Sequence, residues 1–168
     1  MKRFLFLIGF FVGVTIPAEA QVAPYSIAFG LRAGETGQMC GGTVKGFVTN
    51  SLALEGMFGY WHKGLTVTAL AEVHYPLFRV RGLNWYFGGG LHVAGQTGYG
   101  RWYDVQDRGT IYQNGGMGFG MDGIVGVEFK IPVAPVAFSV DFKPYTEINS
   151  HGQLGGGLDP GLSVKLAF

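Results

Sequence analysis

The sequence predicts an all-β fold, an eight-stranded antiparallel up-and-down transmembrane β-barrel. Three observations predict it. Apolar and polar residues alternate along eight segments, as they do in strands with one apolar and one polar face. Glycine is abundant (30 of 168 residues) and aromatic residues reach 15%, while charged residues reach only 14%, which is unlike a disordered chain. After the first 20 residues, no run of about 18 apolar residues could form a membrane-spanning helix.

The first 20 residues have the features of an export signal. Lys2 and Arg3 form a basic start, residues 4–16 are almost all apolar, and Ala18-Glu19-Ala20 supplies the small residues that a signal peptidase reads. The apolar run is shorter than the ~20 residues of a spanning helix, which argues against a permanent anchor. We therefore expect a signal peptide over residues 1–20 and a barrel domain over residues 21–168.

The charge balance excludes one class of partner. Removing Lys2, Arg3 and Glu19 leaves 10 basic and 10 acidic residues, and no basic stripe of the kind that binds nucleic acid is present. Cys40 is the single cysteine, so an internal disulfide is impossible. The cysteine is expected to be unpaired in a loop, and pairing with another molecule is the alternative.

Four strands are expected in the first half of the chain, at residues 25–33, 42–49, 52–61 and 65–75. The second of these has the weakest alternation. Their apolar faces carry, in order, Tyr25, Ile27, Phe29, Leu31 and Ala33; Val44 and Val48; Leu54, Phe58 and Tyr60; and Leu65, Val67, Ala69, Ala71, Val73 and Tyr75. The opposite faces are polar or small, which is the period-2 pattern of a strand.

The second half alternates more regularly and predicts strands at residues 83–94, 117–130, 136–145 and 162–168. Their apolar faces carry Leu83, Trp85, Phe87, Leu91 and Val93; Met117, Phe119, Met121, Val125, Val127 and Phe129; Val136, Phe138, Val140 and Phe142; and Leu162, Val164, Leu166 and Phe168. Short connections at 49–51, 76–82 and 131–135 alternate with longer ones at 34–40, 95–115 and 149–161. Outer-membrane barrels have short periplasmic turns and longer outer loops; the tight connection at 62–64 departs from that rule.

Alternation alone leaves open a soluble, lipocalin-like barrel that carries a ligand. Three features favour the membrane. No charged residue lies on an apolar face, as expected where Arg or Lys at the bilayer midplane costs ~2–4 kcal/mol. Glycines lie on the polar faces, where a narrow barrel needs room for its own side chains. These are Gly30, Gly59, Gly88, Gly90, Gly118, Gly120 and Gly126.

The third feature is the end of the sequence. Leu162, Val164, Leu166 and Phe168 form an alternating apolar run that closes on phenylalanine, and this run resembles the signal that the outer-membrane barrel assembly machinery recognises. We therefore expect that machinery and outer-membrane lipid as partners, and the cell outer membrane as the location. Aromatic girdles are expected at both interfaces: Tyr25, Tyr75, Trp85 and Phe168 on the periplasmic side, and Phe58, Tyr60 and Trp102 on the outer side.

Four segments also resemble a known family. Residues 72–78, 82–90, 120–130 and 161–164 are similar to the small "porin-like" outer-membrane β-barrel proteins of Gram-negative bacteria. The resemblance covers most of the chain after residue 20 and is greatest from Leu65 to Lys143. It implies an OmpA/OmpX-like barrel in the outer membrane, and it implies no particular activity.

The polar faces collect the candidate site residues. These are Arg32, Lys45, Glu55, Glu72, His74, His92, Asp122, Glu128, Lys130, Asp141, Lys143 and Lys165. Because buried charges must be paired and an eight-stranded interior is filled by side chains, we expect a polar network that closes the barrel. A small pore for ions or solutes is the alternative interpretation of the same residues.

Other chemistry has little support in the sequence. Ser150-His151 and His62 lie in expected outer loops, and adjacent loop residues rarely form a nucleophile–base pair with its third orienting group. A lipid-modifying enzyme therefore stays a minor alternative. The four histidines lack metal-ligand spacing, and Gly88-Gly89-Gly90 lacks the lysine and helix of a phosphate-binding loop. We expect a non-enzymatic barrel without a cofactor, and the sequence does not predict its oligomeric state.

Overall fold

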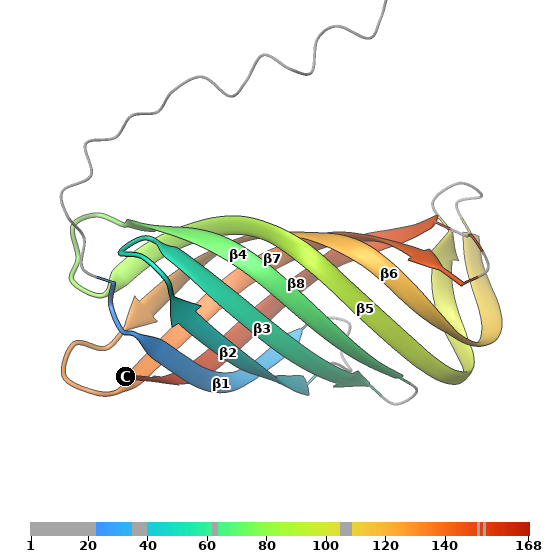
Figure 1. Cartoon of the computed structure of the whole chain (residues 1–168), viewed down its shortest axis with the longest axis horizontal. Helices are drawn as coiled ribbons and strands as arrows, with labels where there is room; N and C mark the ends of the chain where they lie inside the picture. The colour runs from blue at the N-terminus through green and yellow to red at the C-terminus, as the bar shows by residue number, and fades with distance from the viewer. Residues whose placement is uncertain (1–22, 35–39, 62–63, 105–108, 151, 153) are drawn as a thin grey trace, which may run out of the picture.

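The fold is taken from a computed structural model that describes residues 23–34, 40–61, 64–104, 109–150, 152 and 154–168. Eight antiparallel strands follow one another around a closed barrel, as Figure 1 shows. They are β1 (Ile27–Gly34), β2 (Cys40–Phe47), β3 (Leu52–Trp61), β4 (Gly64–Pro76), β5 (Leu83–Asp104), β6 (Gly109–Lys130), β7 (Val136–Asn149) and β8 (Leu154–Ala167). The predicted fold class is therefore confirmed. The expected signal peptide, residues 1–20, lies outside the described residues.

The barrel closes where the first strand pairs with the last. Ala28 pairs with Ala167 and Gly34 with Gly161 at the two ends of this β1–β8 seam. Around the barrel wall, closure leaves no free sheet edge. The connections after β2, β4 and β6 lie at one end of the barrel together with Phe168, and we call this the turn end. The opposite end, where β5 and β6 project, is the hairpin end (Figure 1).

The distribution of apolar and charged side chains on the barrel wall is the reverse of that in a water-soluble protein. Outward positions carry exposed apolar residues such as Phe29, Leu91, Phe119 and Leu162, whereas inward positions carry buried charged residues. In the described part of the chain no helix is long and apolar enough to cross a membrane.

Two expected loops are strand for most of their length. The expected loop at 95–115 is the continuation of β5 and β6, which pair from Leu83↔Phe129 to Asp104↔Gly109 with one register shift between Gln96 and Tyr99. The expected loop at 149–161 is mostly β8, which begins at Leu154. In residues 96–104 and 109–115 glycine, polar and aromatic residues follow one another without regular alternation, so the sequence there lacks the period-2 pattern. One further bridge, Asp104↔Gly155, joins β5 to β8 at the hairpin end.

The prediction that Tyr25 faces outward is wrong. We expected it to face outward with Ile27 and Phe29, but its side chain is buried and its hydroxyl donates to Glu128 Oε1 at 2.8 Å. Because β1 begins only at Ile27, the alternation of the strand does not constrain Tyr25. The ring packs edge-on against Phe47 with the centroids 5.1 Å apart, and it fills the turn end together with Ala28, Ala137 and Ala167.

Candidate functional site

The interior charges gather into two clusters. The turn-end cluster contains Lys45, Glu55, Glu72, Glu128 and Lys165, and the hairpin-end cluster contains Arg32, His92, Asp122, Asp141, Lys143, Glu147 and Asp159. Among the residues that the structure describes, no salt bridge joins one cluster to the other.

The turn-end cluster is centred on Lys45, whose side chain has no exposed surface. Its Nζ lies 2.7 Å from Glu55 Oε2 and 2.6 Å from Glu72 Oε2. The Lys45 ammonium therefore forms direct ion pairs with both carboxylates. Lys165 Nζ approaches Glu55 Oε1 at 2.9 Å and Glu128 Oε2 at 3.3 Å. Two ammonium groups thus hold three carboxylates.

Polar and aromatic neighbours complete this cluster. Thr43 donates its hydroxyl to Glu55, and His74 Nε2 lies 3.2 Å from Glu72 Oε2. The His74 ring stacks on Tyr86 with the centroids 4.8 Å apart, and Lys45 Nζ lies 4.3 Å from the centre of the Tyr86 ring. Every side of the ammonium group is therefore occupied by a carboxylate or a ring face, which is the condition for tolerating a buried charge.

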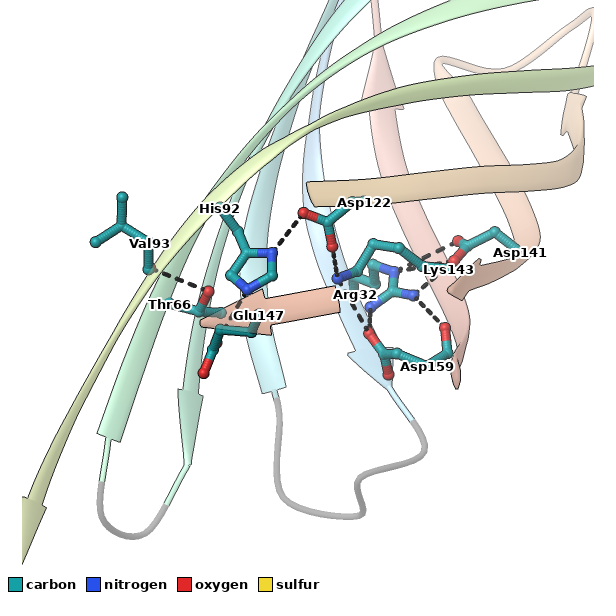
Figure 2. A network of polar contacts seen from close by, with 9 residues as sticks. All are labelled: Arg32, Thr66, His92, Val93, Asp122, Asp141, Lys143, Glu147 and Asp159. Carbon is teal, nitrogen blue, oxygen red and sulfur yellow. Dashed lines mark hydrogen bonds and ion pairs between the residues drawn. The ribbon is translucent and has the colours of Figure 1, made fainter. Parts of the chain in front are cut away.

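The hairpin-end cluster is built on Arg32, which lies between two carboxylates in Figure 2. Its Nη2 is 2.6 Å from Asp141 Oδ1, and its Nη1 is 2.8 Å from Asp159 Oδ2. Arg32 comes from β1, Asp141 from β7 and Asp159 from β8, so the guanidinium holds the closing seam from inside. Planar, forked donors of this kind suit two carboxylates at once.

His92 and Lys143 extend the hairpin-end cluster across β5, β6 and β7. His92 Nδ1 lies 2.6 Å from Asp122 Oδ2, and His92 Nε2 lies 3.0 Å from Glu147 Oε2, as drawn in Figure 2. Lys143 Nζ donates to Asp122 Oδ1 at 2.8 Å. Each carboxylate of this cluster therefore has a cation or an imidazole beside it.

On β3 to β6 an apolar group lies between the two clusters, and on β7 and β8 the buried residues Ser139 and Ser163 lie between Glu128 of one cluster and Arg32 of the other. Met57, Leu70, Tyr86 and Ile124 are buried and in contact with one another. Along β6 the inward residues run Asp122, Ile124, Gly126 and Glu128, so Ile124 lies between a member of each cluster. From the turn end inward, the barrel is therefore filled by an apolar group around Tyr25, an ionic layer, a mainly apolar layer that includes Ser139 and Ser163, and a second ionic layer.

Inward glycines make room for these side chains. A Cβ at Gly126 would lie 2.6 Å from the Tyr86 ring, a Cβ at Gly161 would collide with the Arg32 guanidinium, and a Cβ at Gly120 would collide with the His92 ring. By contrast, Gly42 and Gly56 have open space where a Cβ would be. At these three inward glycines the space is taken by the charged or aromatic side chain opposite, whereas at Gly30, Gly88 and Gly90 a Cβ would first meet a backbone carbonyl of the neighbouring strand.

Of the 12 candidate residues, 11 are buried and belong to or touch one of the two clusters. Lys130 does not join them, because its Nζ donates to the carbonyl oxygens of Ile131 and Ala134 in the turn after β6. It lies at the last residue of the strand, past the enclosed interior.

Glu147 and Asp159 belong to the hairpin-end cluster and were not among the residues predicted from the sequence. Glu147 lies on the same face of β7 as Asp141 and Lys143, because all three are alternate residues of the strand. Extending the predicted alternation past Tyr145 would therefore have identified it. Asp159 fell within an expected loop, and only the extended β8 places it inside.

The remaining candidates for chemistry are a metal site and the residues Ser150, His62 and His151. In the described part of the chain, no group of three or more His, Cys, Asp and Glu side chains is arranged to hold a metal ion. Ser150 follows β7, and its amide donates to Met117 O at 2.8 Å; His62 and His151 lie outside the described residues.

No family model and no curated protein sequence matches the chain. The structure is similar to the crystal structure of the N-terminal β-barrel domain of Pseudomonas aeruginosa OprF, with a TM-score of 0.59 and 18% sequence identity. The match covers 86% of this chain and 98% of that domain. The shared fold is a closed eight-stranded barrel. At this identity the similarity establishes the fold and leaves the activity open.

Proposed function

We propose that this protein is a non-enzymatic outer-membrane barrel whose interior is closed by its own side chains, and which presents β5–β6 and the start of β8 outside the cell. The observation that carries the proposal is the stack of two ionic layers separated by an apolar layer. An ion crossing the barrel would have to break buried pairs in both layers, and breaking one such pair costs about 3–5 kcal/mol.

Location in the outer membrane rests on the wall of the barrel. Its outward apolar side chains, from Phe29 on β1 to Leu162 on β8, are exposed and suit contact with lipid. The turn end is then periplasmic and the hairpin end extracellular, because outer-membrane barrels have short periplasmic turns. The expected signal peptide supports export but lies outside the described residues.

Planar-bilayer recording tests the closed interior. The purified protein, folded in detergent and checked by a heat-dependent shift on a gel, is expected to give no stable single-channel steps. The paired variant Lys45→Ser with Arg32→Ser removes one cation from each ionic layer and serves as the opened control. Discrete steps from the unaltered protein would support the alternative, a small pore.

The other two alternatives have direct tests of their own. A soluble carrier needs an apolar interior for its ligand, whereas this interior holds Lys45 and Glu72; recovery of the protein from the periplasmic fraction without detergent would favour the carrier. A lipid-modifying enzyme predicts that the lipid profile of the membrane changes in a Ser150→Ala or a His151→Ala variant. An unchanged profile is expected.

A further inference from the structure

The turn between β4 and β5 is strained. Val80 N donates to Leu77 O at 3.2 Å, and the two residues enclosed by this bond, Phe78 and Arg79, have φ values of 53° and 56°. Two successive positive φ values are typical of a type I′ turn, which prefers Asn and Gly. For other residues this conformation costs free energy. Strained backbone conformations of this kind are found mainly at functional sites, where they position a functional group.

The strained turn exposes an unusual pair of side-chain types. Phe78 is 83% exposed, Val80 is also exposed, and Arg79 and Arg81 on either side of it are exposed. Neither arginine forms a salt bridge with any residue that the structure describes. An apolar ring flanked by unpaired guanidinium groups suits an anionic surface with an apolar layer beneath it.

The charges around this turn favour an anion. None of the three connections at the turn end, residues 48–51, 77–82 and 131–135, contains an acidic residue. The turns after β4 and β6 are neighbours, because Lys130 N donates to Gly82 O at 2.8 Å. The second turn adds Val133, which is 95% exposed. The inward acidic residues that the structure describes are paired with cations inside the barrel.

The aromatic residues beside the turn indicate where it lies relative to the membrane–water interface. Tyr75 on β4 and Trp85 on β5 stack with their ring centroids 5.4 Å apart, and Phe87 continues the stack. Outward Tyr and Trp side chains are typical of the membrane–water interface. The turn begins at Leu77, two residues after Tyr75. Phe78, Arg79 and Arg81 therefore lie within reach of the lipid headgroups.

We propose that the Leu77–Gly82 turn binds the phosphate headgroups of anionic phospholipids in the inner leaflet. Arg79 and Arg81 contact the phosphates, and Phe78 inserts among the upper acyl carbons. This inference rests on the proposed outer-membrane function, which fixes the turn end at the periplasmic face. A periplasmic protein is the competing occupant of the same surface.

Quenching of Trp85 by brominated lipid tests the proposal. In a Trp61→Phe, Trp102→Phe background, Trp85 is the remaining tryptophan and lies beside the turn. The protein is folded into phosphatidylcholine vesicles that contain increasing fractions of dibrominated phosphatidylglycerol, with dibrominated phosphatidylcholine as the reference. We expect phosphatidylglycerol to be preferred by about fivefold for each arginine, the equivalent of about 1 kcal/mol per basic residue near an anionic surface.

Matched variants separate charge from structure. Arg79→Gln with Arg81→Gln should abolish the preference, whereas Arg79→Lys with Arg81→Lys should keep most of it, and high salt should weaken it. Phe78→Asn with Arg79→Gly relieves the strained turn, so this variant should unfold at a higher temperature in detergent and lose part of the preference.

The outcomes distinguish this inference from the proposed function. A protein that does not insert, and shows no heat-dependent gel shift, contradicts the proposed function. A protein that inserts but quenches equally with both lipids overturns the headgroup site, as does a preference that survives in the Gln variant. Equal quenching combined with photo-crosslinking of residue 78 to a periplasmic protein would assign the surface to that partner instead.

Discussion

Arg32 is the residue on which the hairpin-end cluster depends, because it faces Asp141 and Asp159 at once. Arg32→Met keeps the length of the side chain but removes the guanidinium from both buried carboxylates, leaving only the more distant Lys143 Nζ, 3.9 Å from Asp159 Oδ2, beside them. Breaking a buried pair in this way costs about 3–5 kcal/mol. We therefore expect the free energy of unfolding to fall by that amount in a urea titration of the vesicle-embedded barrel, followed by tryptophan fluorescence.

Two controls accompany this variant. Leu31→Met changes the neighbouring residue, which faces outward, and should shift the free energy of unfolding by less than about 0.5 kcal/mol. Adding Asp141→Asn and Asp159→Asn to Arg32→Met should recover part of the loss, because the uncompensated charges are gone. No loss in Arg32→Met would mean that solvent reaches these carboxylates freely.

Two glycines provide a second test at the scale of single residues. Gly126→Ala places a methyl group 2.6 Å from the Tyr86 ring and 2.7 Å from Val140 O, and overpacking of this kind costs about 1–3 kcal/mol. Gly56→Ala has nothing within 4 Å and should be neutral or stabilising. The same urea titration measures both variants. Equal effects would contradict the filled interior.

At the scale of elements, the period-2 pattern predicted strands well where each has one face toward lipid. The bounds of β3 were predicted exactly as Leu52–Trp61, and those of β4 within one residue. The pattern failed in residues 96–104 of β5 and 109–115 of β6, where the sequence does not alternate. There the backbones of β5 and β6 remain paired, and backbone pairing alone leaves no alternation in the sequence.

The interior could be predicted only in part for the same reason. Parity indicates which residues face inward, and it does so for Lys45, Glu72 and Asp141. Parity cannot show which charges pair, because Arg32 and Asp141 are 109 positions apart and meet only across the closed barrel. Tyr25 lies outside any strand and needed the folded turn end to reveal its contact with Glu128.

The projecting part of β5 and β6 should be dispensable for folding. Up to Gln96, β5 pairs with both β4 and β6, whereas beyond it the described pairings are to β6 and, at Asp104, to β8. Deleting residues 99–114 keeps the Gln96↔Gly116 pair and leaves a short connection. We expect this variant to keep its heat-dependent gel shift and vesicle insertion; loss of insertion would show that the projection takes part in folding.

At the scale of the whole molecule, the apolar layer should make the two ionic layers energetically independent. The losses in Arg32→Met and Lys45→Met should add within about 0.5 kcal/mol, as expected for sites without shared partners. Arg32→Met and Lys143→Met share Asp159, whose Oδ2 lies 2.8 Å from Arg32 Nη1 and 3.9 Å from Lys143 Nζ. That pair should depart from additivity by more, as measured by double-mutant cycles; the reverse pattern would mean that the clusters act as one.

The unequal strand lengths affect the surrounding bilayer. β1 and β2 have eight residues each, and β5 and β6 have 22 each. At about 3.3 Å per residue and a tilt near 40°, eight residues rise about 20 Å, which is less than the apolar band of about 25 Å that such barrels present. Lipids compensate for a short span by thinning. We therefore expect the membrane to be thinnest along β1 and β2, next to the seam where the first strand meets the last.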